Sequence, residues 1–99
     1  MPFLSFSIDP GHPSYAGHFP GMPITPGVLL LDEAMHRIAV AEKLNLQHCK
    51  LNSAKFMKPV LPGTALTLHY DCRPNGNINF EIKDHEESVV ALGAFAPKR

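Results

Sequence analysis

Two side chains that can exchange protons, His18 and Asp32, flank the start of the longest helical pattern in the sequence. Between them, Thr25 is suited to cap a helix and Pro26 to occupy its first position. Gly27 would then lie in the first turn, where backbone N–H groups have no partner inside the helix. A base, an acid and free N–H donors are what proton transfer beside a developing negative charge requires. The segment therefore predicts an acid–base site at the start of a helix.

The composition of the 99-residue chain predicts one globular domain over residues 1–99. Hydrophobic residues make up 44% of it, and nine acidic residues balance nine basic ones. No basic stripe indicates nucleic-acid binding, and the helical pattern carries several charged residues, which argues against a membrane span. No signal peptide is expected at the start of the chain. Cys49 and Cys72 lack a CxxC spacing, which favours a reduced, cytoplasmic protein.

Hydrophobic periodicity predicts one strand followed by one helix in the first half of the chain. The strand is expected from Phe3 to Ile8, where hydrophobic and polar residues alternate. The helix is expected from about Pro26 to about Leu44, with Asn45 able to end it. Residues 28–31 are all apolar, so the first turns of the helix are expected to be buried.

The second half of the chain predicts strands. A mixed run at 49–58 ends in a rigid Pro-rich turn at 59–63. Alternating strands are expected at 64–72 and 78–82, and the run at 88–96 is apolar on both faces. A hairpin signal at 74–76 joins two of them. The predicted fold class is α+β: one helix followed by a four-strand antiparallel meander, with a first strand before it. Four strands can cover so apolar a helix only if the sheet curls around it.

Two segments carry a resemblance to a known family. The first is His18-Phe19-Pro20-Gly21-x-Pro23-x-x-Pro26-Gly27-Val28-Leu29, with an acid fourteen residues after the histidine. The second, in the expected place after the helix, is Ala54-Lys55-Phe56-Met57-Lys58-Pro59-Val60-Leu61-Pro62-Gly63. Both resemble the 3-hydroxyacyl-acyl-carrier-protein dehydratases of bacterial fatty-acid synthesis. The resemblance implies a hotdog fold, in which a curved antiparallel sheet wraps a long central helix, and a homodimer whose active sites are built from both protomers.

The resemblance also implies roles for individual residues. His18 matches the catalytic histidine, and Asp32 matches the catalytic acid. Gly27 matches the glycine whose N–H binds the thioester carbonyl, and Phe19 is expected with it in the substrate-binding segment. His36 stands where the family usually has glutamine, four residues after the acid, and is expected to be either a partner of Asp32 or a surface residue. The chain also begins near the first strand, which implies a more open substrate channel or a cover from elsewhere.

The resulting prediction is dehydration of 3-hydroxyacyl thioesters, bound to acyl carrier protein, in fatty-acid, polyene or polyketide synthesis. His18 would act as the base, and Asp32 would be kept protonated by burial against residues 28–31 and Met35. No cofactor is expected because acid and base are side chains, and the scattered histidines predict no metal site. Two alternatives stay open. One is a hotdog thioesterase, and the other is a non-catalytic subunit that binds acyl chains or pairs with an active partner.

Overall fold

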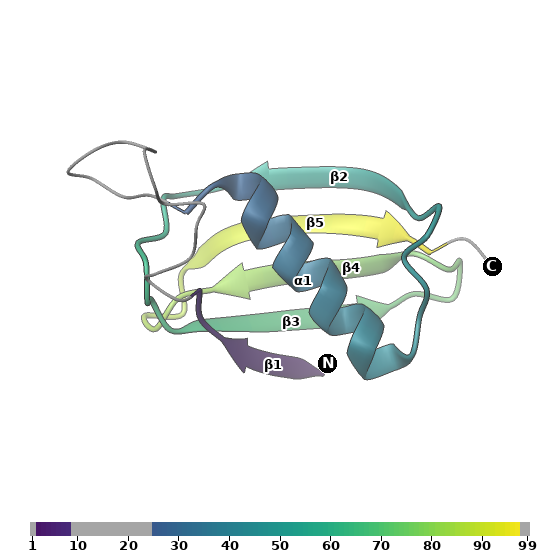
Figure 1. Ribbon diagram of the computed structural model, residues 1–99, viewed down its shortest axis with the longest axis horizontal. Helices are drawn as coiled ribbons and strands as arrows, with labels where there is room; N and C mark the ends of the chain where they lie inside the picture. The colour runs from purple at the N-terminus through teal and green to yellow at the C-terminus, as the bar shows by residue number, and fades with distance from the viewer. Residues whose placement is uncertain (1, 9–24, 98–99) are drawn as a thin grey trace.

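The computed structural model describes residues 2–8 and 25–97 and shows one helix lying across a five-stranded antiparallel sheet (Figure 1). In chain order the elements are β1 (Phe3–Phe6), α1 (Gly27–Glu42), β2 (Lys50–Phe56), β3 (Leu66–Cys72), β4 (Ile78–Lys83) and β5 (Val89–Ala96). The strand order across the sheet is β1-β3-β4-β5-β2. This arrangement confirms the predicted α+β class.

The position of β2 differs from the predicted meander. Strands β3, β4 and β5 follow one another as antiparallel neighbours, but β2 pairs with β5 rather than with β3. Lys50 lies opposite Ala96 and Phe56 opposite Ala91, so β2 forms one edge of the sheet and β1 the other. Alternation in a sequence predicts which face of a strand is buried, but not which strand lies beside it. The connection at 57–65 carries the chain from β2, at one edge, past β5 and β4 to β3.

The core lies between the sheet and α1. Buried side chains alternate along the central strands, where Leu68 lies opposite Ile82 and Tyr70 opposite Phe80. From the helix, Leu30, Ala34 and Ile38 are buried at four-residue spacing and form its inner face. The rest of the buried hydrophobic set is Phe6, Ile8, Ala39, Val60, Leu66, Ile78, Val90, Ala91 and Phe95.

Helix α1 both begins and ends within the predicted range. Pro26 is extended (φ −60°, ψ 139°) and occupies the capping position itself, so the predicted cap at Thr25 is wrong by one residue. At the other end, Lys43 adopts a left-handed conformation (φ 57°) that stops the helix before Asn45. Its N–H and that of Leu44 both donate to the carbonyl of Ala39. Within the described ranges, α1 is neither long nor apolar enough to cross a membrane.

The first turns of α1 are less buried than predicted. Leu30 is 3% exposed, but Val28 is 75% exposed and its other apolar neighbours are only half-buried. The reason is that a helix lying across a sheet buries one face only. Val28, Asp32, His36 and Val40 follow one another at four-residue spacing on the opposite face, and all four are exposed in the single chain. We call these four residues the outer stripe of α1.

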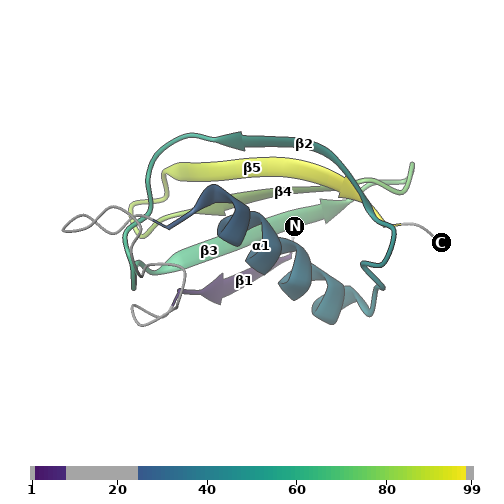
Figure 2. The same ribbon diagram turned by 45° about the horizontal axis from the view of Figure 1, so that its top comes forward.

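Strand β2 is also open to solvent. All seven of its side chains are exposed, whereas buried positions recur along β3, β4 and β5. Figure 2 shows β2 at the edge of the sheet, with α1 running away from it toward β1. An edge strand presents backbone N–H and C=O groups that can pair with another strand. The single chain therefore has an exposed edge and an exposed helix face.

Candidate active site

The two segments that carry the motif residues meet at the start of α1. Together they line a pocket of about 540 Å³. The N–H of Thr25 donates to the carbonyl of Val60 at 2.8 Å, which joins the residue before the helix to the residues after β2. The lining residues are Thr25, Gly27, Val28, Leu30, Phe56, Met57, Lys58, Pro59 and Val60. We call residues 56–60 the pocket wall.

Gly27 lies directly against the pocket wall. A Cβ added to Gly27 would lie 2.8 Å from ring atoms of Phe56, so a side chain here would force the half-exposed ring to move. Gly27 is also the first residue of α1, and the first helical N–H bonded to the Pro26 carbonyl is that of Leu29, at 3.0 Å. The N–H of Gly27 therefore lies at the open, electropositive end of the helix, inside the pocket lining.

Asp32 and His36 lie on the outer stripe, one helical turn apart, and both are exposed. The predicted burial of Asp32 is therefore wrong for the single chain: Leu31 and Met35 are half-buried, but Asp32 is not. The reason is geometric, because Asp32 occupies the face of α1 opposite the sheet. The described residues therefore do not provide the burial that the predicted acid role requires.

His36 also lines a groove between α1 and the edge strand β1, together with Leu4, Ser5, Arg37, Val40 and Ala41. Arg37 is held there by an ion pair with Glu33 (3.0 Å) and by the ring of Phe6, whose centroid lies 4.8 Å from the guanidinium carbon. His36 therefore contributes to an exposed groove next to Asp32. Both of its predicted roles, as a partner of Asp32 and as a surface residue, remain open.

His18 and Phe19 lie outside the described residues, so the structure does not place them relative to Gly27 or Asp32. Their roles remain predictions. Within residues 2–8 and 25–97, no group of three His, Cys, Asp or Glu side chains could hold a metal ion. The predicted absence of a metal and of a cofactor also remains a prediction.

Sequence reasoning did not find the ion pair at the pocket wall. The ammonium of Lys58 lies 2.6 Å from Oδ2 of Asp84, a residue of the β4–β5 turn that is 8% exposed. The other oxygen of Asp84 accepts hydrogen bonds from the N–H groups of Glu86 (2.9 Å) and Ser88 (3.0 Å). The bond from Lys58, aided by these backbone donors, lowers the pKa of Asp84 to about 2. The sequence shows a polar turn at this point, but no local pattern pairs it with Lys58.

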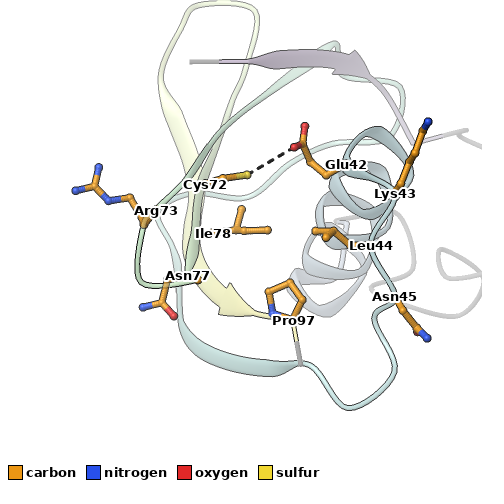
Figure 3. A pocket seen from close by; sticks show the side chains of 10 residues that line it. Glu42, Lys43, Leu44, Asn45, Cys72, Arg73, Asn77, Ile78 and Pro97 are labelled. Atoms are coloured by element: carbon orange, nitrogen blue, oxygen red, sulfur yellow. Dashed lines mark hydrogen bonds between the residues drawn. The ribbon is translucent and has the colours of Figure 1, made fainter. Parts of the chain in front are cut away.

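A second pocket lies at the opposite end of α1, where Glu42 and Lys43 line it (Figure 3). The carboxylate of Glu42 accepts a hydrogen bond from the Tyr70 hydroxyl at 2.6 Å and contacts the Cys72 sulfur at 3.9 Å. Burial raises the pKa of the Cys72 thiol, which disfavours the nucleophilic thiolate. The hydrogen bond to Glu42 and burial raise the pKa of Tyr70 to about 12. These contacts tie the end of α1 to β3, and we assign them a structural role.

Comparison with known proteins identifies relatives over most of the chain. Residues 3–94 match the model of the ApeI-like family, described as ApeI dehydratase. The 3-hydroxyacyl-acyl-carrier-protein dehydratase FabZ of Ehrlichia chaffeensis is 32% identical over 89 residues, which are 83% of this chain and 62% of that protein. The chain thus spans less than two thirds of the length of this relative.

Solved structures confirm the predicted hotdog fold. The dehydratase heterocomplex ApeI:P from Xenorhabdus doucetiae matches with a TM-score of 0.77 and 25% identity, over 98% of this chain and 86% of that one. A trans-AT PKS dehydratase domain from Brevibacillus brevis matches with a TM-score of 0.73 and 25% identity, over 97% of this chain and 40% of that one.

The low pKa of Asp84 predicts how the stability of the fold depends on pH. Asp84 titrates near 3.8 when unperturbed and near 2 in the folded chain, so its carboxylate stabilises the fold above about pH 4. This contribution is lost as pH falls from about 4 through 2. We expect Asp84→Asn to lower the melting temperature at pH 7, and the two proteins to converge near pH 2. Thermal unfolding followed by circular dichroism at several pH values measures this.

The matched control for this prediction is Glu86→Gln, in the same turn, where the side chain is 73% exposed. Glu86→Gln should leave the melting temperature almost unchanged at every pH. If the melting temperature of Asp84→Asn lies below that of wild type by the same amount from pH 7 to pH 2, the ionised carboxylate is not the stabilising group.

Proposed function

This chain belongs to the ApeI-like dehydratase family, and we propose from this that it removes water from 3-hydroxyacyl thioesters to give trans-2-enoyl thioesters. The observation that carries the proposal is the pocket at the start of α1, where the two motif segments meet and Gly27 packs against Phe56. We also propose that the substrate is bound to acyl carrier protein and that residues 1–99 form a single domain. The proposed location is the cytoplasm. Two free cysteines among the described residues support that location.

The proposed reaction moves two protons and breaks one C–O bond. The imidazole of His18 takes the proton from C2 of the acyl chain, and electron density shifts onto the thioester oxygen. The N–H of Gly27 donates to that oxygen at the positive end of α1. The C3–O bond then breaks as Asp32 gives its proton to the leaving hydroxyl, which departs as water. A double bond remains between C2 and C3, and proton return from His18 restores Asp32.

The lining of the pocket supports the role of Gly27. Apart from Thr25 and Lys58, its side chains are apolar or absent. Val28 and Phe56 are 75% and 48% exposed in the single chain, so the acyl chain or a second chain would have to exclude water. Exclusion of water would strengthen the hydrogen bond to the developing negative charge. The ring of Phe56 covers the Cα side of Gly27 and thereby limits the direction from which a thioester can approach the N–H.

We further propose a homodimer in which each active site takes residues from both chains. The support is the surface that the single chain exposes: the unpaired edge of β2 and the outer stripe, where Val28 is 75% and Val40 66% exposed. A second chain on these surfaces would pair the edge strand and cover Asp32. Asp32 would then gain the burial that its acid role requires, beside His18 of the partner subunit.

A second candidate is a heteromeric complex, because the ApeI:P neighbour is itself a dehydratase heterocomplex. In that case the covering chain would be a different hotdog protein. The same surfaces of α1 and β2 would be used, but the purified chain alone would be inactive. Activity that returns only when a second, related chain is added would favour this candidate over the homodimer.

The direct test of the proposed function is to incubate the purified chain with a 3-hydroxyacyl thioester of a holo-acyl carrier protein. Mass spectrometry should show loss of one water, and the conjugated enoyl product should absorb in the ultraviolet. Free carrier-protein thiol without enoyl product would instead identify a thioesterase. Absence of both products, with or without a related second chain, would contradict an enzymatic function.

The role of Gly27 predicts the effect of removing its N–H. Proline is tolerated at the first helical position, and the extended Pro26 that precedes it suits a following proline. A side chain at this position would collide with Phe56, so the test uses a Phe56→Leu background. In that background, Gly27→Pro should lower kcat by about 10²–10³. In the same background, Gly27→Ala keeps the N–H, and its kcat should fall by less than about tenfold. Equal kcat values for folded Pro and Ala variants would exclude the oxyanion role.

The shared site predicts that two inactive variants restore each other. His18→Ala and Asp32→Ala should each abolish turnover, because each removes one of the two proton-transfer groups. When the two purified variants are mixed and allowed to exchange subunits, half of the dimers contain one chain of each variant. In each of these mixed dimers, one of the two sites combines an intact His18 with an intact Asp32. Activity should return to roughly a quarter of the wild-type value. A mixture that forms mixed dimers but stays inactive would mean that each site belongs to one chain.

A further inference from the structure

Val28 is the most exposed large hydrophobic side chain in the described part of the chain, at 75%. It lines the pocket beside Gly27, and it is also the first residue of the outer stripe of α1. Phe56 and Met57, which are 48% and 49% exposed, line the same pocket, so the three side chains form one exposed apolar patch. Such a patch is typical of a surface that another molecule covers. Val28 therefore lies where the pocket and the outer stripe meet.

The direction of α1 determines which part of a second chain would meet this patch. The helix begins at Gly27, against Phe56 at the end of the edge strand β2. It ends at Glu42, whose carboxylate accepts a hydrogen bond from Tyr70 of β3 (Figure 1). In the proposed homodimer the two chains pair along their β2 edges, so the starts of the two helices lie nearer the shared edge than their ends do. The outer stripes of two copies would therefore meet near their first residues.

The proposed reaction needs an acid inside this pocket. With the thioester oxygen at the N–H of Gly27, the leaving hydroxyl is bonded to the second carbon from the thioester carbonyl. A general acid must lie within hydrogen-bond reach of that hydroxyl. Asp32 of the same chain is not among the residues that line the pocket, because it lies one helical turn beyond Val28 on the outer stripe. In the proposed homodimer, the acid in this pocket is instead Asp32 of the partner subunit.

A two-fold axis makes every contact between two copies of a chain reciprocal. An acid that enters the pocket beside Gly27 also lies beside Val28, which is the exposed side chain of that lining. We propose that Val28 covers the carboxyl group of Asp32 of the partner subunit and, by excluding water from it, keeps it protonated for the reaction. This inference rests on the proposed function and its homodimer. Val28 would act through the acid and not on the substrate, so it is a positioning residue.

The charged or titratable groups that would surround Asp32 come from both chains. They are Glu33, His36 and Arg37 of its own helix, and the partner subunit's His18, Lys58 and Asp84. Glu33 and Arg37 form an ion pair at 3.0 Å, and so do Lys58 and Asp84 at 2.6 Å, so each pair is neutral as a whole. A substitution of Val28 changes none of these groups, and its effect on the ionisation of Asp32 therefore reports the cover itself.

Val28→Thr tests the cover with a side chain of nearly the same shape. Its hydroxyl replaces one methyl group and can donate a hydrogen bond to the carboxylate, which favours the ionised form. Because Asp32 must hold a proton to act, kcat falls as rising pH ionises it. In Val28→Thr this fall should begin about one pH unit lower than in wild type. The acid-side limb of the profile, which belongs to the base His18, should stay in place. The measurement is kcat against pH on a 3-hydroxyacyl thioester of holo-acyl carrier protein.

The matched control is Val40→Thr, the same substitution at the other end of the outer stripe. Val40 is 66% exposed and does not line the pocket, so Val40→Thr should keep the pH profile of wild type. Val28→Ile keeps the cover apolar and should also keep that profile. If kcat falls at the same pH in Val28→Thr and in wild type, or if Val40→Thr shifts the profile equally, the proposal is overturned.

Disulfide cross-linking tests the contact without any turnover. In a background in which Cys49 and Cys72 are replaced by serine, a Val28→Cys chain is mixed with an Asp32→Cys chain and oxidised. A disulfide requires Cβ atoms about 3.5–4.5 Å apart, so the reciprocal contact should give a covalent dimer. Mass spectrometry of the linked peptides should join positions 28 and 32, and Val40→Cys mixed with Asp32→Cys should give no such link.

The two experiments separate failure of this contact from failure of the proposed function. If wild type turns over no 3-hydroxyacyl thioester, the proposed function fails, and cross-linking still tests whether Val28 meets Asp32 of the partner subunit. Absence of the link between positions 28 and 32 would overturn the proposal. So would a link between Val28→Cys and Val40→Cys chains, because the two-fold axis would then lie near the middle of α1.

Discussion

The unpaired edge of β2 is the constraint on which the rest of this structure depends. An edge strand presents backbone groups that can pair with another strand, and among the described residues β2 pairs with β5 alone. All seven side chains of β2 are exposed, and so is the outer stripe of α1. Asp32 is on that stripe, so the surface that would meet the second chain of the proposed homodimer also carries the proposed acid. In that proposal, assembly and catalysis depend on the same exposed surface.

The pocket depends on a second contact, between the start of α1 and the residues after β2. The Thr25–Val60 hydrogen bond and the packing of Gly27 on Phe56 bring together segments far apart in the sequence. The Lys58–Asp84 pair extends this contact to the β4–β5 turn. The pocket wall is thus fixed by α1, the edge strand β2 and the β4–β5 turn together, and these contacts position the open N-terminus of α1 beside it.

The sequence predicted the features that depend on local pattern. Alternation predicted the ranges of β3 and β4 within a few residues, and a run that is apolar on both faces predicted that of β5. Alternation also predicted the buried Phe6 and Ile8 near β1. Features set by distant residues were not predictable in this way. The place of β2 depends on the path of the 57–65 connection, and the start of α1 depends on Val60. The exposure of Asp32 follows from which face of α1 meets the sheet, and the Lys58–Asp84 pair has no local signal at all.

Amide hydrogen exchange along β2 tests most directly whether a second copy of the chain completes this molecule. If it does, the outer N–H groups of β2 are paired in the dimer and should exchange slowly at high protein concentration. After dilution below the dissociation constant of the dimer, they should exchange rapidly, while the N–H groups of the central strand β4 remain protected at both concentrations. Rapid exchange along β2 at every concentration, with β4 still protected, would contradict the account.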